Sequence, residues 1–133
     1  MQYPYLLDRN ILSNLIRHPN GTIFFKIKEV GEANISTSII VACELAFGAE
    51  KKQSKRLQER VNLILDLVPI APMLAGMEKV YGKIRAILEH QGTPIGGNAL
   101  LIASQAIYAN LILVTDNTGE FKRMPGLSVE NWL

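Results

Sequence analysis

The apolar residues of this chain alternate between short segments of strand length and longer segments with helical periodicity. The expected strands cover residues 3–7, 33–37, 68–70, 111–115 and 127–129. Between them, apolar positions recur every three or four residues, which is the spacing of one face of an α-helix. The expected helices follow residue 8 up to a break at 18–21, then cover residues 22–30, 39–50, 54–67, 77–91 and 99–109, with a helical turn at 120–123.

This order of elements predicts an α/β fold. Strands that alternate with helices, and that read largely as continuous apolar runs, are typical of a parallel sheet covered on both faces. We therefore expect a three-layer α/β/α arrangement with a central parallel sheet of about five strands. The prolines are dispersed and no linker or repeat divides the chain, so residues 1–133 form one expected domain.

Composition and charge narrow the class further. The chain has 133 residues, 48% of them hydrophobic and 20% charged, which excludes a disordered protein. No apolar run reaches the roughly 18 residues of a membrane-spanning helix, and the first seven residues do not resemble a secretory leader. We expect a cytoplasmic protein with no membrane partner. The net charge of +2 is too small for a polybasic nucleic-acid binder, and the single Cys43 is expected as a reduced, buried thiol.

Three acidic residues occupy positions that suggest chemistry. Asp8 and Asp116 each follow an expected strand, and ligands of parallel sheets bind at the carboxyl ends of strands. Glu44 interrupts a helix whose apolar residues cover every face, which leaves it no obvious solvent-facing position. If the three converge, their repulsion raises at least one pKa, and a divalent cation would neutralise them. Oxygen ligands without His or Cys favour Mg²⁺ or Mn²⁺, ions that support phosphodiester chemistry.

Ordinary structural roles remain open for each of these acids. Asp8 and Asp116 could each cap the following helix or close a turn. Glu44 could be partly exposed at a helix edge, as most charged residues are. The three positions together are harder to explain in this way than any one of them alone.

Five stretches of the sequence form a more specific pattern. They are residues 6–12 (LLDRNIL), 38–48 (SIIVACELAFG), 92–103 (GTPIGGNALLIA), 113–121 (LVTDNTGEF) and 125–132 (PGLSVENW). In order and spacing they resemble the PIN-domain ribonuclease toxins of the VapC type, and the likeness runs through the whole chain in register. The expected α/β/α domain is therefore PIN-like.

This resemblance implies an endoribonuclease toxin that uses Mg²⁺, or Mn²⁺, to activate water for cleavage of RNA, with tRNA a common target. It implies a VapB-like antitoxin partner, contact with DNA only through that antitoxin, and a homodimer. Asp8 and Glu44 match the first two acidic positions of the family, and Asp116 with Asn117 matches the polar pair after its penultimate strand. The three acids are the expected metal ligands. The side chains expected to orient ligands or water are those of Asn10, Asn98, Thr115 and Asn117, with Asn98 also expected as a helix cap.

The chain departs from the family pattern at three positions. Arg9 stands where Thr is usual, and Asp116 stands where many relatives have Asn. Ala99 stands where the family has a further acidic metal ligand, in the first turn of a helix whose dipole would favour a negative charge. We therefore expect this chain to be inactive or weakly active. Ala99 is either an engineered inactivation or natural in a degenerate paralogue, and the intact surrounding motif favours engineering.

Basic residues offer a further hypothesis. Arg9, Lys52 and Arg56 are candidate contacts for RNA or antitoxin, although a solvated helix face explains most of the cations between residues 51 and 60 better. Arg9 could instead pair with an acid. His18 and His90 have no catalytic arrangement in the sequence, so we assign them none.

Other functions compete with a nuclease. A binding module of the same fold would hold antitoxin or RNA without cutting, and a metal-dependent nuclease assay would separate the two. A phosphoaspartate receiver needs an acidic pair after the first strand, and a haloacid-dehalogenase-like phosphatase needs Asp where this chain has Asn10. Neither pattern is present.

Overall fold

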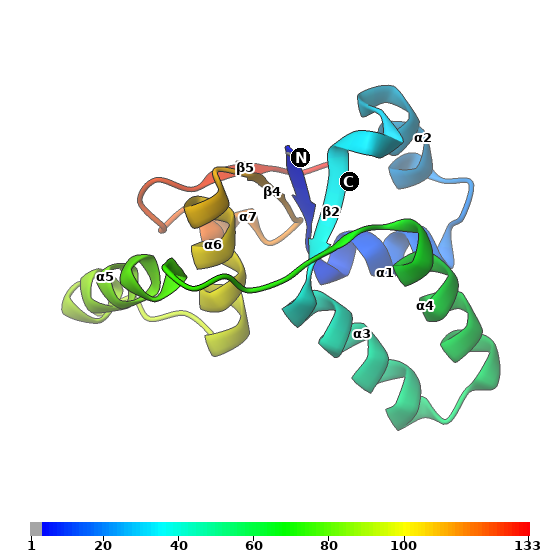
Figure 1. Ribbon diagram of the computed structural model, residues 1–133, viewed down its shortest axis with the longest axis horizontal. Helices are drawn as coiled ribbons and strands as arrows, with labels where there is room; N and C mark the ends of the chain where they lie inside the picture. Colours follow the sequence, from blue (N-terminus) through cyan, green and yellow to red (C-terminus); the bar gives the residue numbers. More distant parts are fainter. Residues whose placement is uncertain (1–3) are drawn as a thin grey trace.

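The computed structural model describes residues 4–133 and builds them around a five-stranded parallel sheet (Figure 1). The strand order is β3-β2-β1-β4-β5, and every neighbouring pair is parallel. The strands are β1 (Tyr5–Leu7), β2 (Ile35–Ser38), β3 (Ile70–Ala71), β4 (Ile112–Val114) and β5 (Ser128–Glu130). The expected α/β class and parallel sheet are confirmed. Residue 3, where the first strand was expected to begin, lies outside the described residues.

Seven α-helices lie within residues 4–133, close to the positions that periodicity predicts. They are α1 (Arg9–Arg17), α2 (Thr22–Val30), α3 (Ile39–Lys52), α4 (Lys55–Leu67), α5 (Met77–His90), α6 (Gly97–Ala109) and α7 (Thr118–Phe121). A 3₁₀ turn, Glu32–Asn34, takes the start of the segment expected as the second strand. None of the helices in this part of the chain is long and apolar enough to cross a membrane.

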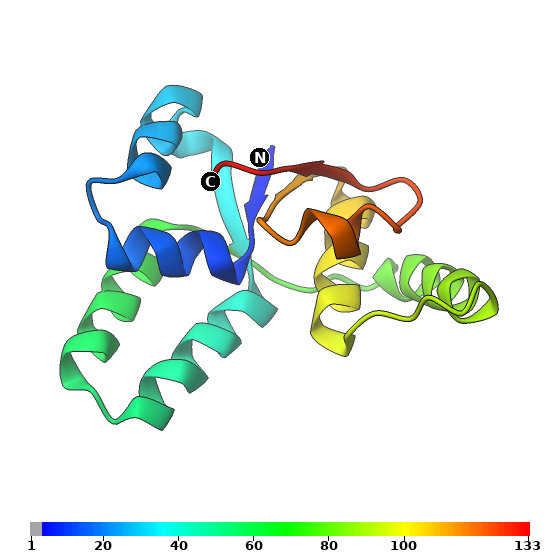
Figure 2. The ribbon, with the colours of Figure 1, turned by 180° about the vertical axis from the view of Figure 1, so that it is seen from behind.

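The chain order determines where the layers lie and where the sheet changes direction. The chain moves from β1 outward to β2 and β3, then crosses back to β4 on the other side of β1. Because parallel crossovers are right-handed, the two directions place their helices on opposite faces. Figures 1 and 2 show α1, α2 and α4 on one side of β1 and β2, and α5 and α6 on the other. The switch point therefore lies between β1 and β4.

The core is formed by the central strands and the helix faces turned toward them. Leu6 and Leu7 of β1 and Leu113 and Val114 of β4 are fully buried, as continuous apolar runs predict. In α1, four apolar residues at helical spacing face the sheet: Ile11, Leu12, Leu15 and Ile16. This packing fixes the start of α1, and with it the residues that directly follow β1.

Helix α3 differs from the expectation of a helix buried on all sides. Ile39, Cys43 and Phe47, which share one face at four-residue spacing, are exposed. The prediction of a buried Cys43 thiol is therefore wrong, because apolar residues all around a helix do not require a protein partner on every face. Glu44 is half-buried at the edge of this helix and not fully enclosed.

The start of α6 also differs from the sequence prediction. The helix begins at Gly97, its N-cap is Gly96, and no side chain caps it. Asn98 is thus inside the first turn, and the prediction that it caps the helix is wrong. Its side-chain amide instead donates a 3.4 Å hydrogen bond to Oε2 of Glu44 on α3. This contact reaches into the region where the candidate acids lie.

Candidate active site

Asp8 lies at the junction of β1 and β4, directly after the last residue of β1. Leu7 pairs with Val114 in the sheet, and the Asp8 backbone N–H continues the ladder with a 2.9 Å bond to the carbonyl of Val114. One carboxylate oxygen accepts from the backbone N–H of Arg9 at 2.8 Å, which caps α1. The other accepts from the hydroxyl of Thr115 at 2.8 Å. The side chain is therefore held in one orientation from both sides.

The environment of Asp8 shifts its titration. Burial raises the pKa of the Asp8 carboxyl, because the charged form loses hydration, and the side chain is only 8% exposed. The hydrogen bonds from Arg9 and Thr115 and the positive charge of Arg9 lower this pKa, while the negative charge of Asp116 raises it further. The net direction is upward. The expected repulsion between acids contributes, but burial is the larger cause.

Asn10 connects the start of α1 to the turn after β4. Its amide donates to Oδ1 of Asp116 and, at 3.3 Å, to the hydroxyl oxygen of Thr115. The Asp116 backbone N–H is 3.5 Å from Asn10 Oδ1. Asp116 itself is exposed, unlike Asp8. The structure thus links Asp8 and Asp116 through Thr115 and Asn10.

Glu44 reaches the same region from α3, on the other side of Asp8. A small hollow of about 160 Å³ is lined by Asp8, Glu44 and Ala99 together with Arg9, Asn10, Ile102, Asn117 and Phe121. Ala99 is in the first turn of α6, next to the Asn98 that bonds Glu44. Position 99 therefore faces the two carboxylates that the sequence placed in a metal site.

Asn117 is placed differently from the other candidate polar residues. Its backbone N–H donates to the Thr115 hydroxyl at 3.1 Å, which closes the turn after β4. Its side-chain amide donates to Oε2 of Glu120 at 2.8 Å and not to one of the candidate acids. Asn117 lines the hollow, but its hydrogen bonds shape the turn.

The candidate site has the right type of ligand for a hard divalent cation, but too few ligands. Asp8 and Glu44 supply carboxylate oxygens, which Mg²⁺ and Mn²⁺ prefer. However, within residues 4–133 no three Asp, Glu, His or Cys side chains lie close enough together to hold a metal ion. The residues present therefore do not complete a metal centre. The methyl group of Ala99 occupies the place on the hollow from which one more carboxylate could reach it.

A larger cleft of about 420 Å³ adjoins this hollow. Arg9, Asn10, Glu44 and Asp116 lie on its lining together with apolar residues of α1, α3 and α4, namely Ile16, Leu45, Leu57 and Val61. Lys52 is on the cleft as well, whereas Arg56 lines a separate hollow. Arg9 makes no ion pair of 4.0 Å or less with any acid in the described chain, so pairing with a neighbouring acid is not what holds it.

Sequence reasoning missed two polar residues of this cleft. Ser13 and Arg17 line it together with Arg9. The three positions are spaced by four residues on α1 and thus share one helix face. A helical projection of residues 9–17 would have identified them.

Comparison with known proteins agrees with this fold. The PIN domain family model matches residues 5–127. The chain is 40% identical to the Ribonuclease VapC2 of Rickettsia felis, over 96% of this chain and 97% of that protein. It is 31% identical to the tRNA(fMet)-specific endonuclease VapC of Shigella flexneri, again over 96% and 97% of the two chains.

Solved structures show the same architecture. A chain in the crystal structure of VapBC2 from Rickettsia felis bound to a promoter DNA fragment superposes with a TM-score of 0.90 at 37% identity, covering 97% of this chain and 98% of that one. A chain in the DNA-bound VapBC from Salmonella typhimurium gives 0.88 at 28% identity, with complete coverage of both. The chain therefore belongs to the PIN-domain family and, within it, to the VapC ribonucleases.

Proposed function

We propose that this protein is the ribonuclease toxin of a toxin–antitoxin pair and that its cleavage site is the hollow between Asp8, Glu44 and position 99. The observation that carries the proposal is the placement of these three positions, which come from three different elements and line one small hollow. The names of the similar proteins, which describe ribonucleases and a tRNA-specific endonuclease, support RNA as the substrate. Cleavage takes place in the cytoplasm, where the RNA is.

The complete site is a Mg²⁺ site, with Mn²⁺ as a substitute, and this chain has an impaired form of it. When bound, a divalent cation supplies an activated water and stabilises charge on the attacked phosphate. In a complete site Asp8 and Glu44 would hold the cation, and Asp116 would add a ligand directly or through water. Asn10 orients Asp116, and Thr115 orients Asp8. Ala99 removes one ligand from this set.

Restoring a carboxylate at position 99 tests the proposal. We expect Ala99→Asp to cleave RNA in the presence of Mg²⁺ at least about 100-fold faster than the parent chain, the scale of losing one charge-stabilising group. Ala99→Asn is the matched control, because it has nearly the same size without the charge, and EDTA should abolish the gain. If Ala99→Asp keeps the fold of the parent and gains no cleavage, the nuclease proposal is wrong.

A second function fits the incomplete donor set. A chain without a full metal centre among its described residues could act as a binding module that holds its antitoxin, or RNA, without cutting. The same experiment separates the two functions, since a purely binding protein would not gain cleavage from one carboxylate.

The antitoxin partner fits the larger cleft. Its apolar floor lies between Arg9 and Arg17 on α1 and Lys52 on α3, which suits a peptide with apolar side chains flanked by acidic ones. The two similar solved structures described above are VapBC complexes bound to DNA. We extend this to the present chain as binding of a VapB-like antitoxin, with DNA contacted only through that antitoxin.

We also propose that the protein is a homodimer through the outer face of α3. Ile39, Cys43, Ala46 and Phe47 share this face and are exposed, with Phe47 65% exposed. Exposed large apolar side chains that adjoin one another mark protein contacts. Glu50 and Lys51, which carry opposite charges, follow at the C-terminal end of this face, and Lys51 Nζ lies 6.0 Å from the centroid of the Phe47 ring. The small Cys43 and Ala46 let two such helices approach closely.

A further inference from the structure

The end of the α3–α4 hairpin carries a concentration of positive charge, of which only Lys52 lines the cleft described above. Between residues 50 and 60 there are five basic residues, Lys51, Lys52, Lys55, Arg56 and Arg60, against two acidic ones. All five are exposed. The ion pairs found among residues 4–133 are Lys26–Glu29, Lys28–Glu32 and Arg85–Glu89, so none of the five forms an ion pair of 4.0 Å or less.

The helix dipole explains only part of this charge. Lys51 and Lys52 are in the last turn of α3, where the partial negative charge of the helix end favours cations. Lys55 and Arg56 are in the first turn of α4, which contains no acidic residue and where the dipole disfavours cations. The positive charges of Lys55 and Arg56 therefore destabilise α4. An anion bound beside them would offset this destabilisation.

Three of these residues line a hollow of their own. Lys52, Arg56 and Arg60 line it together with Ser54 and Leu57, so four of the five residues on its wall are polar and three are cationic. It lacks the apolar floor of the neighbouring cleft, which Ile16, Leu45 and Val61 help to form. A peptide would find little apolar surface to bury there, whereas a phosphate backbone needs none.

This hollow lies beside the larger cleft. Lys52 and Leu57 line both, and the lining of the cleft also includes Arg9, Glu44 and Asp116. Along α3, Glu44 and Lys52 are eight residues apart, a rise of about 12 Å. A stacked strand with one phosphate per about 3.4 Å would place three or four phosphates over this distance.

We infer that Lys52, Arg56 and Arg60 bind backbone phosphates of the RNA several nucleotides away from the bond that is cut. The inference rests on the proposed nuclease function and adds to it a path for the substrate. These contacts make RNA binding depend on RNA length, because a very short RNA that fills the hollow at Asp8 and Glu44 cannot reach the α3–α4 helices. Bound phosphates there also remove the electrostatic penalty at the start of α4.

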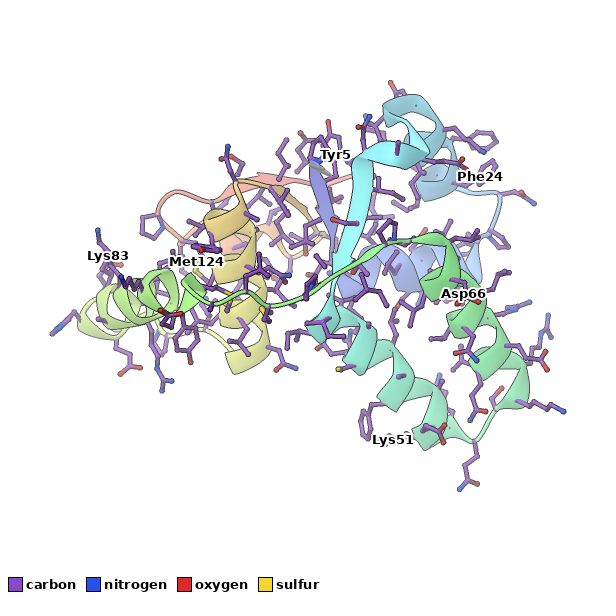
Figure 3. All side chains as sticks on the ribbon, in the orientation of Figure 1. Tyr5, Phe24, Lys51, Asp66, Lys83 and Met124 are labelled. Atoms are coloured by element: carbon purple, nitrogen blue, oxygen red, sulfur yellow. The ribbon has the colours of Figure 1, made fainter. Side chains whose placement is uncertain are left out.

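Binding of a fluorescein-labelled RNA hairpin, measured by anisotropy in EDTA over a range of salt concentrations, tests this surface. The variant is Arg56→Gln with Arg60→Gln, two exposed arginines four residues apart on α4. Its matched control is Lys79→Gln with Lys83→Gln, two exposed lysines at the same spacing on α5 that also take part in no ion pair of the described chain. Figure 3 shows that Lys83 is on the opposite side of the molecule from Lys51.

We expect the α4 variant to bind the hairpin about 25-fold more weakly at about 0.1 M salt, with a salt dependence that is less steep by about 1.4. The α5 control should bind as the parent does, and neither variant should have a lower melting temperature than the parent. Equal losses in the two variants, no loss in the α4 variant, or no RNA binding by the parent would each overturn the inference. So would a poly-glutamate peptide that binds this surface more tightly than RNA at the same salt.

Cleavage by the Ala99→Asp form separates this inference from the proposed function. In that background the α4 substitutions should lower kcat/KM for the hairpin and leave cleavage of a tetranucleotide unchanged. If Ala99→Asp cuts neither RNA, the proposed nuclease function is wrong. The binding measurement still decides whether Arg56 and Arg60 bind RNA. Equal effects on the hairpin and the tetranucleotide would contradict a contact distant from the cleavage site.

Discussion

The hydroxyl of Thr115 donates a 2.8 Å hydrogen bond to Oδ2 of Asp8 and joins the ends of β4 and β1 at the point where the sheet changes direction. The same oxygen accepts from the Asn117 backbone N–H and from the side chain of Asn10. Thr115 is fully buried. One side chain thus orients the candidate metal-binding carboxylate and closes the following turn.

Replacing Thr115 by Val, which has nearly the same shape, removes these three hydrogen bonds. We expect the free energy of unfolding to fall by about 1–3 kcal/mol, because buried polar partners are left unsatisfied. For a domain of this size this lowers the melting temperature by roughly 4–10 °C. In the Ala99→Asp background, Thr115→Val should lower cleavage, whereas Thr115→Ser keeps the hydroxyl and should retain cleavage. If Val and Ser behave alike, the hydroxyl does not position Asp8.

The sequence predicted the fold better than it predicted the details of the site. The runs at β1 and β4 are fully buried on both faces, so their pattern alone indicated a parallel sheet and placed Asp8 and Asp116 at its edge. The role of Thr115 did not follow from spacing, since residues 8 and 115 meet only through strand pairing. Asn98 was mistaken for a helix cap because glycines before it can begin a helix without a side-chain cap. The exposure of Cys43 depends on tertiary packing, which periodicity in α3 does not encode.

The proposed dimer contact predicts the effect of a charge on the outer face of α3. Phe47→Asp places a carboxylate opposite its own copy, so we expect the variant to be monomeric where the parent is dimeric. Phe25→Asp is the matched control, because Phe25 is similarly exposed, at 62%, but is on α2. The molar mass from light scattering coupled to gel filtration provides the measurement. If Phe47→Asp is still dimeric, the outer face of α3 is not the dimer contact.

Two glycines on the segment leading into and through α5 should respond oppositely to the same substitution. Gly76 has φ +107°, and a Cβ there would collide with the hydroxyl of Tyr108, which bonds the Ala75 carbonyl at 3.1 Å. We expect Gly76→Ala to destabilise the protein by about 2–3 kcal/mol. Gly82 is exposed within α5, and a Cβ added there would meet no atom within 4 Å, so Gly82→Ala should stabilise by about 0.5–1 kcal/mol. Thermal unfolding of both variants provides the measurement. If both substitutions raise the melting temperature, or both lower it, the prediction is wrong.

The raised pKa of Asp8 predicts how stability changes with pH. Burial makes the folded protein bind the Asp8 proton more tightly than the unfolded chain does. In the unfolded chain the pKa of Asp is about 3.9. Ionisation therefore costs stability, beginning near the unfolded pKa and becoming complete above the raised folded pKa. Asp8→Asn escapes this cost, so its melting temperature relative to the parent should increase from pH 4 to pH 7. The exposed Asp66 provides the control for the substitution itself, since Asp66→Asn makes the same change on the surface of α4 (Figure 3), and the pH-dependent gain should be larger for Asp8→Asn. A flat difference for Asp8→Asn would mean that Asp8 is no harder to ionise in the folded protein than in the unfolded chain.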